Sequence, residues 1–318
     1  MVAQPRRRHA QTDPNTNTFQ ELTPANHQLR ETLMSSLPYR VHRRVSAVDT
    51  PEVPGSTGKW PKRPRSLSAE QIAANDDFMR LWHEILPRRY GMVERFNHSF
   101  PVQHSRPGFR RTLEIGAGLG EHLNHERLSA EQRAAYSVVE MRTNMVEQLR
   151  ARHPHISVVV GDCQGYLPFP DNHFDRYLAI HVLEHLPDLP SCIRQAWRLL
   201  DKERGQLLVV IPCEGGLAYS LARRASAQPI FERTYRMPYR PIIEHEHINR
   251  PHEIIAELKP YFTLETQCFF PVRALPVVSA NLCLGIALRP RPTLGKFHGG
   301  DGALRQSGAD GALQAEGG

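Results

Sequence analysis

The chain has 318 residues, of which 40% are hydrophobic, and a formal net charge of +7 at pH 7. This length and composition are sufficient for one large α/β domain with appendages. No apolar run approaches the roughly 20 residues of a membrane-spanning helix, and no apolar segment follows the N-terminal arginines to form a secretory signal. The five cysteines contain no C-x-x-C pair, which argues against a disulfide framework or a cysteine zinc site and favours a reducing, cytoplasmic setting.

The positive charge is concentrated in residues 1–65, which hold eleven Lys/Arg against five Asp/Glu, an excess of six positive charges. The rest of the chain is close to neutral, so its charge does not indicate a face for nucleic acid. Residues 1–65 are rich in Pro, Arg, Thr, Asn and Ser, and residues 291–318 are rich in Gly and Ala. Both segments are predicted to be disordered.

Ordered structure is predicted to begin at Ser68, because Ser68 and Gln71 have the spacing of a helix capping box. Apolar residues then recur at approximately helical spacing until Pro87, which is expected to end the helix. Such a helix either covers a bound ligand or packs on the following sheet as core.

From residue 111 the pattern alternates between strand and helix, which is typical of a parallel sheet. Strands are predicted at 111–115, 136–140, 156–160, 174–180 and 206–211, and helices near 119–128, 143–152 and 189–200. The run Val158–Val160 is apolar throughout, which predicts a strand covered on both faces.

The alternation breaks after Pro212. Residues 213–250 contain a short amphipathic stretch near 217–225 and then a loop with prolines and histidines, and this length favours a lid or an acceptor pocket. A helix from Glu253 to Tyr261, introduced by Pro251, and strands at 262–272 and 281–288 complete the predicted sheet.

Three glycines follow the first predicted strand at alternate positions: Gly116, Gly118 and Gly120. A tight turn from strand to helix requires glycine where φ is positive or where a ligand lies against the main chain. A dinucleotide fingerprint would place its third glycine at position 121, which is Glu121. The pattern here is G-x-G-x-G, with an acid, Glu114, two residues before the first glycine.

Polar side chains follow the next three strands. Glu140 ends the second strand, where an acid can accept hydrogen bonds from both ribose hydroxyls of an adenosine lying over the glycine turn. Met141 is placed to pack on an adenine face. Asp162 and the N–H of Cys163 follow the third strand and can bond to the adenine ring, while His181 follows the fourth strand at the carboxyl edge, where α/β sheets hold ligands.

Together these motifs resemble the class I S-adenosylmethionine-dependent methyltransferases, type 11 subfamily, over residues 111–212. The resemblance implies a doubly wound, mostly parallel α/β sheet of order 3-2-1-4-5-7-6 with the last strand antiparallel, helices on both faces, and S-adenosyl-L-methionine as cofactor. With the flanking elements, we expect a methyltransferase domain at 66–290, with an N-terminal covering helix and an acceptor or lid insert at 213–250. The cofactor-binding residues that the resemblance implies are Glu114, Gly116, Ala117, Gly118, Glu140, Met141, Asp162 and Cys163. His181 departs from the family, whose members usually carry a small polar residue there.

Three alternatives remain open. The run His181–His185 also spells H-x-x-E-H, a zinc-peptidase signature that needs both histidines on one face of a long helix. A nicotinamide-dependent oxidoreductase shares the sheet and the glycines but lacks the third glycine of its fingerprint. A methyltransferase fold without catalysis could serve as a binding module.

The region 244–252 is dense in histidine and has three readings: a metal cluster, a substrate-facing loop with a general base, or a solvated polar loop. Five arginines of the insert could receive an acidic or phosphorylated acceptor, or simply keep the surface soluble: Arg223, Arg224, Arg233, Arg236 and Arg240.

We therefore expect methyl transfer to a small-molecule, sugar or lipid-like acceptor, with nucleic acid disfavoured and no metal required. The candidate catalytic bases are His181, His245 and His247.

Overall fold

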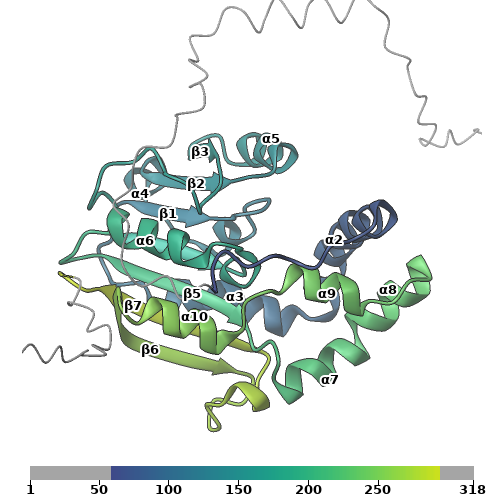
Figure 1. Ribbon diagram of the computed structural model, residues 1–318. Helices are drawn as coiled ribbons and strands as arrows, with labels where there is room; N and C mark the ends of the chain where they lie inside the picture. The colour runs from purple at the N-terminus through teal and green to yellow at the C-terminus, as the bar shows by residue number, and fades with distance from the viewer. Residues whose placement is uncertain (1–58, 294–318) are drawn as a thin grey trace, which may run out of the picture. The chain divides into compact units, whose positions relative to one another are not determined.

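The computed structural model describes residues 59–293, which form a seven-stranded sheet with helices on both faces (Figure 1). The sheet order is β3-β2-β1-β4-β5-β7-β6, as the sequence predicted. The strands are β1 (Thr112–Ile115), β2 (Tyr136–Glu140), β3 (Ser157–Val160), β4 (Arg176–Ile180), β5 (Gln206–Pro212), β6 (Phe262–Phe270) and β7 (Cys283–Pro290).

The first five strands pair in parallel, and β7 pairs antiparallel with both β5 and β6. The predicted antiparallel last strand is therefore confirmed. Because parallel strands end at the same edge, the segments that follow β1, β2, β4 and β5 meet there.

Apolar side chains on the two faces of the sheet form two cores. On one face, alternate residues of β1, β4 and β5 pack against α6 (Leu189–Leu199) and α10 (Pro251–Leu258). On the other face, the intervening residues of β4 and β5 pack against α3 (Gly91–His104) and α5 (Thr143–Arg152). This alternation is the period of two that a strand imposes on its side chains. It explains why apolar residues fill nearly the whole of β5, which is covered on both faces.

The prediction of a helix near 119–128 is wrong. A short 3-10 helix, η1 (His122–His125), follows the glycine turn, and α4 (Ala130–Ala134) begins only after Ser129. The Ser129 hydroxyl accepts from the Gln132 N–H, and the Gln132 side chain accepts from the Ser129 N–H, which forms a capping box. The S-x-x-Q spacing at 129–132 therefore marked the actual helix start.

The expectation that Val158–Val160 is covered on both faces is also wrong. In the described residues β3 pairs only with β2 and lies at the edge of the sheet, and the Val160 side chain is 47% exposed. A continuous apolar run does not distinguish a central strand from a partly covered edge strand.

The first described helix, α2 (Ala69–Arg89), begins with the predicted Ser68–Gln71 capping box, in which each residue's N–H donates to the other's side chain. It continues two residues beyond Pro87, the expected end. Helix α3, which the sequence analysis did not predict, follows it directly and contains Pro101. Phe96 and Phe100 bury its inner face, and a Cβ at Gly285 of β7 would lie 2.5 Å from the Phe100 ring.

The insert at 213–250 is helical. The amphipathic stretch near 217–225 is α7 (Leu217–Ala225), but the expected loop beyond it is mostly α8 (Ala227–Tyr235) and α9 (Arg240–Glu246). Figure 1 shows these helices and α2 together beyond the carboxyl ends of the strands. We call α2, α7, α8 and α9 the cap.

The cap has a hydrophobic cluster of its own. Phe78 of α2 contacts Phe231 of α8 edge to face, with ring centroids 5.2 Å apart, and Tyr239 packs on both rings. The Tyr235 hydroxyl also donates to Asp77 Oδ2 over 2.8 Å. Burial of aromatic side chains of this size provides a large part of the stability of a small cluster.

Residues 59–65 precede the cap without regular secondary structure but contact α10. Trp60 Nε1 donates to Glu257 over 3.0 Å, and Lys62 Nζ donates to Glu253 over 2.8 Å. The sequence analysis predicted disorder for residues 1–65 and 291–318. These hydrogen bonds contradict that prediction for residues 59–65, and residues 1–58 and 294–318 lie outside the described part of the chain.

Candidate active site

The glycine turn after β1 depends on backbone geometry that glycine adopts readily. Gly116, Gly118 and Gly120 have φ values of +60°, +59° and +83°, in the left-handed region. A Cβ at Gly116 would lie 2.6 Å from a methyl carbon of Val182, in the segment after β4. Ala117, between the first two glycines, is buried. The turn therefore brings bare main chain to the carboxyl edge of the sheet.

Glu140, at the end of β2, reaches this turn. Its side chain is 3% exposed, and Oε2 accepts a hydrogen bond from Gly118 N over 3.1 Å. Oε1 accepts from the N–H and Nε of Arg142, over 3.0 and 3.2 Å. The neighbouring Met141 is 65% exposed and open to a ligand. The structure thus brings the predicted acid and the predicted turn together.

Glu114 lies within β1 and is 2% exposed. Its Oε2 accepts from the Tyr136 hydroxyl over 2.6 Å. Burial raises the pKa of this carboxyl, although nearby His122, the Tyr136 hydrogen bond and Arg176 act in the opposite direction. Its carboxylate is therefore part of a buried network below the turn, while its main chain leads into the glycines.

Asp162 and Cys163 follow β3 at the same edge. Asp162 is exposed and accepts from Gln164 N over 2.9 Å, while Cys163 is buried. Gln164 in turn accepts from Asp188 N over 2.6 Å, which links this loop to the segment after β4.

His181, directly after β4, has φ +53°, a conformation uncommon for residues other than glycine. Its Nδ1 lies 3.1 Å from Glu184 Oε1, and its Nε2 is buried without a hydrogen-bond partner in the described part of the chain. Backbone strain of this kind is often retained at functional sites.

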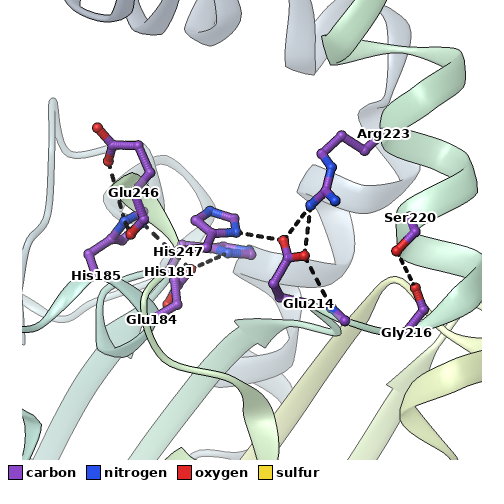
Figure 2. Close-up of polar contacts among 10 residues, drawn as sticks. His181, Glu184, His185, Glu214, Gly216, Ser220, Arg223, Glu246 and His247 are labelled. Atoms are coloured by element: carbon purple, nitrogen blue, oxygen red, sulfur yellow. Dashed lines mark hydrogen bonds and ion pairs between the residues drawn. The ribbon is translucent and has the colours of Figure 1, made fainter. Parts of the chain in front are cut away.

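Around His181 lies a group of ionisable side chains that we call the polar cluster (Figure 2). His247 Nδ1 lies 3.0 Å from Glu214 Oε2, and Arg223 Nη1 donates to both oxygens of Glu214. The members of the polar cluster are His181, Glu184, His185, Glu214, Arg223, Glu246 and His247.

Hydrogen bonds and neighbouring charges shift the pKa values of several side chains in the polar cluster. Burial alone would raise the pKa of Glu214, but hydrogen bonds from His247 and Arg223 outweigh it and lower this pKa to about 2. In the same way, His185 and Asn75 lower the pKa of Glu246 to about 2 against the effect of burial. For His185 the effects are reversed. Burial lowers its pKa, but its contacts with Glu246 and Glu184 outweigh burial, so the pKa is raised above its usual value. Opposite charges are therefore held together in a partly buried cluster.

The three predicted bases have different surroundings. His181 and His247 both belong to the polar cluster, whereas His245 Nδ1 lies 2.7 Å from the carbonyl oxygen of Arg65. The structure therefore groups two of the candidates and directs the third toward the segment before the cap.

Sequence reasoning missed Glu214 and Glu246 as members of this site. Glu214 follows β5 by two residues, so the rule that located Glu140 at a strand end also applies to it. Glu246 ends α9, and its position depends on the fold of the insert.

The arrangement does not fit the zinc-peptidase alternative. His181 ends a strand, and His185 ends η2 (Leu183–His185), a 3-10 helix of three residues. The two histidines are therefore not on one face of a long helix. No helix within residues 59–293 has both the length and the apolar character needed to cross a membrane.

The sheet order and the glycine turn define the fold of the class I methyltransferases. Residues 113–209 match the profile of a family described as "Methyltransferase domain". This segment is a methyltransferase domain of the type 11 subfamily, the protein is an S-adenosylmethionine-dependent methyltransferase, and S-adenosylmethionine is its cofactor.

Several solved structures have a similar fold. A Pyrococcus horikoshii protein is 14% identical with a TM-score of 0.44, covering 63% of this chain and 91% of its own. The N-methyltransferase NodS of Bradyrhizobium japonicum, solved with S-adenosyl-L-homocysteine, is 15% identical with a TM-score of 0.40, covering 65% and 87%. A possible histamine N-methyltransferase of Thermotoga maritima is 21% identical with a TM-score of 0.42, covering 65% and 98%. No curated protein sequence matched the chain.

Proposed function

We propose that the protein transfers the methyl group of S-adenosylmethionine to a small-molecule, sugar or lipid-like acceptor by in-line displacement. The observation that carries this proposal is the polar cluster, which lies beside the glycine turn and next to the cap. The 2.6 Å approach of a Cβ at Gly116 to Val182 supports this placement, because Val182 directly follows His181.

The cofactor would lie along the carboxyl edge of β1, β2 and β3. In this proposal Glu140 accepts from the ribose hydroxyls, and Asp162 with the N–H of Cys163 contacts the adenine, whose face lies on Met141. The main chain of Gly116, Ala117 and Gly118, with Glu114 beneath it, borders the methionine end. Glu140 would exchange its bond with Gly118 for the ribose.

The sulfonium group of the cofactor supplies an activated methyl group, so the protein has mainly to align the acceptor and exclude water. His181 is the preferred base for an acceptor that must lose a proton. Its Nδ1 is oriented by Glu184 and its Nε2 is unpaired in the described structure. His247 is the second candidate within the polar cluster, and His245 is the third.

The cap is the proposed acceptor-binding part of a domain spanning residues 66–290. Leu217 and Leu221, one turn apart on α7, are 66% and 53% exposed and offer an apolar strip for a lipid-like group. The near-neutral charge outside residues 1–65 argues against nucleic acid as acceptor. We also propose a cytoplasmic location, because all five cysteines are free thiols.

The test is transfer of labelled methyl from S-adenosylmethionine to mixtures of sugars, phenolic metabolites and lipids, with an oligonucleotide as comparison. We expect a methylated product from one of the first three classes. If His181 is the base, His181→Gln should lower kcat by roughly 10²- to 10⁴-fold while leaving the affinity for S-adenosylhomocysteine unchanged. Methylation of the oligonucleotide alone would contradict the proposed acceptor class, and cofactor binding without transfer to any class would favour a catalytically silent binding module.

A further inference from the structure

Within the polar cluster, Glu184, His185 and His247 can each offer one ligand atom to a common point. These three atoms lie within 4.8 Å of one another, and His185 Nε2 is 3.8 Å from Glu184 Oε1. Ligands of one ion at about 2.1 Å lie roughly 3 to 4 Å apart, so small side-chain rotations would bring them onto a metal.

Both imidazoles are held so that Nε2 can act as a ligand. His185 Nδ1 lies 2.8 Å from the carbonyl oxygen of Glu246, which can only accept, so Nδ1 carries the hydrogen. His247 Nδ1 lies 3.0 Å from the Glu214 carboxylate, which Arg223 fixes in turn. Metal-bound histidines in proteins are typically oriented by such an acceptor on their other nitrogen.

The second carboxylate oxygen of Glu184 is an independent observation that favours a cation at this position. Its side chain is 1% exposed, and Oε2 has no hydrogen-bond partner among the described residues. A buried carboxylate oxygen without a partner costs free energy that a bound cation would offset.

The main chain fixes the ligands relative to one another. The N–H groups of Ile248 and Asn249 both donate to the carbonyl oxygen of Glu184 over 3.0 Å. The Asn249 side chain, fully buried, donates to the carbonyl oxygens of Leu183 and Leu186 over 2.8 Å each. His247 is therefore tied to the segment that carries the other two ligands before any ion binds.

We propose that Glu184, His185 and His247 bind a divalent transition-metal ion at the acceptor side of the methyl-transfer site. Two imidazoles and one carboxylate leave coordination positions open, as in sites where a metal binds a substrate or water. The ion would hold an acceptor oxygen and promote its deprotonation. This role rests on the proposed function, whereas binding of the ion does not. The proposed metal site departs from the sequence-based expectation that no metal is required. It also makes His247 a metal ligand, whereas the sequence analysis named it as a candidate base.

The test uses the full chain after dialysis against a chelator, titrated with Co²⁺ and followed by its visible absorption. We expect one equivalent of Co²⁺ to bind with a spectrum of nitrogen and oxygen ligation. His247→Gln and His185→Gln should each weaken binding by more than tenfold, and Glu214→Gln, which removes only the orienting carboxylate, by roughly 10- to 100-fold. His252→Gln is the matched control, because His252 is exposed and lies outside the cluster.

Binding of S-adenosylhomocysteine is measured on the same samples. If His247→Gln still binds S-adenosylhomocysteine, the variant is folded. If the parent does not bind S-adenosylhomocysteine, the proposed function is contradicted but the metal inference is not. The inference is overturned if the parent binds no Co²⁺, or if His247→Gln and His252→Gln bind it equally. It is also overturned if binding is lost in His98→Gln instead, since Glu94, His98 and His125 form another group able to hold an ion.

Discussion

Gly118 combines two requirements at one position: a φ of +59° and an N–H that donates to Glu140. We expect Gly118→Val to destabilise the protein by about 1–2 kcal/mol through backbone strain and to abolish binding of S-adenosylhomocysteine by filling the site. Gly108→Val is a matched control, because Gly108 has φ +77° and a Cβ there would meet nothing within 4 Å. Calorimetry on both variants should show similar destabilisation but loss of binding only at position 118. Unchanged affinity in Gly118→Val would show that the cofactor does not lie against this turn.

At the residue scale, the sequence predicted that Glu140 and the glycine turn would be neighbours, because both follow adjacent parallel strands. It could not predict that Glu214 would pair with His247 and Arg223, since those residues come from different parts of the insert. The spacing of residues along the chain does not predict such contacts, because they depend on how the helices of the insert pack.

At the scale of elements, the segment before the cap is attached to α10 through Glu253, which bonds to Lys59 and Lys62. Burial raises the pKa of Glu253, but hydrogen bonds from Lys62, the Arg250 backbone and Lys59 outweigh it and lower this pKa from 4.5 to about 2. Because the folded-state value is depressed, the resulting stability is present above pH 4.5 and is lost as the pH falls toward 2.

Glu253→Gln should therefore lower the free energy of unfolding by about 2 kcal/mol near neutral pH, and the difference from the parent should shrink as the pH falls through this window. Chemical denaturation of both proteins at a series of pH values measures this difference, in which the other carboxylates cancel. A difference that does not depend on pH would show that the ion pairs add nothing to stability.

Most strands were predicted to within about two residues because apolar side chains define them. Helices α8 and α9 were missed because their apolar residues face the cluster around Phe231, not the sheet, and because Pro229, Pro238 and Pro241 indicated a loop. The helix predicted at 119–128 was wrong for a different reason. His122 is buried and its Nε2 lies 2.8 Å from Glu126, so the spacing of residues in this segment reflects this local contact and not a helix.

At the scale of the whole molecule, the strand order was predictable because alternating strands and helices permit few arrangements, and the resemblance selected one. The cap was not predictable as a unit. Phe78 and Phe231 lie far apart in the sequence, and their contact joins α2 to the insert. The half of the site formed by the parallel strands was therefore accessible from sequence, whereas the half beside the cap required the structure.

The cofactor site is tested most directly by thermal unfolding of the parent and of Glu140→Ala with S-adenosylhomocysteine or NADH. In the parent, S-adenosylhomocysteine at a hundredfold excess over Kd should add about 2.7 kcal/mol to the free energy of unfolding and raise the midpoint, while NADH should not. Glu140→Ala should remain folded and show a much smaller rise, because it lacks the ribose acceptor. A rise with NADH alone would contradict the assignment of the cofactor, and an equal rise in both proteins would contradict the role of Glu140.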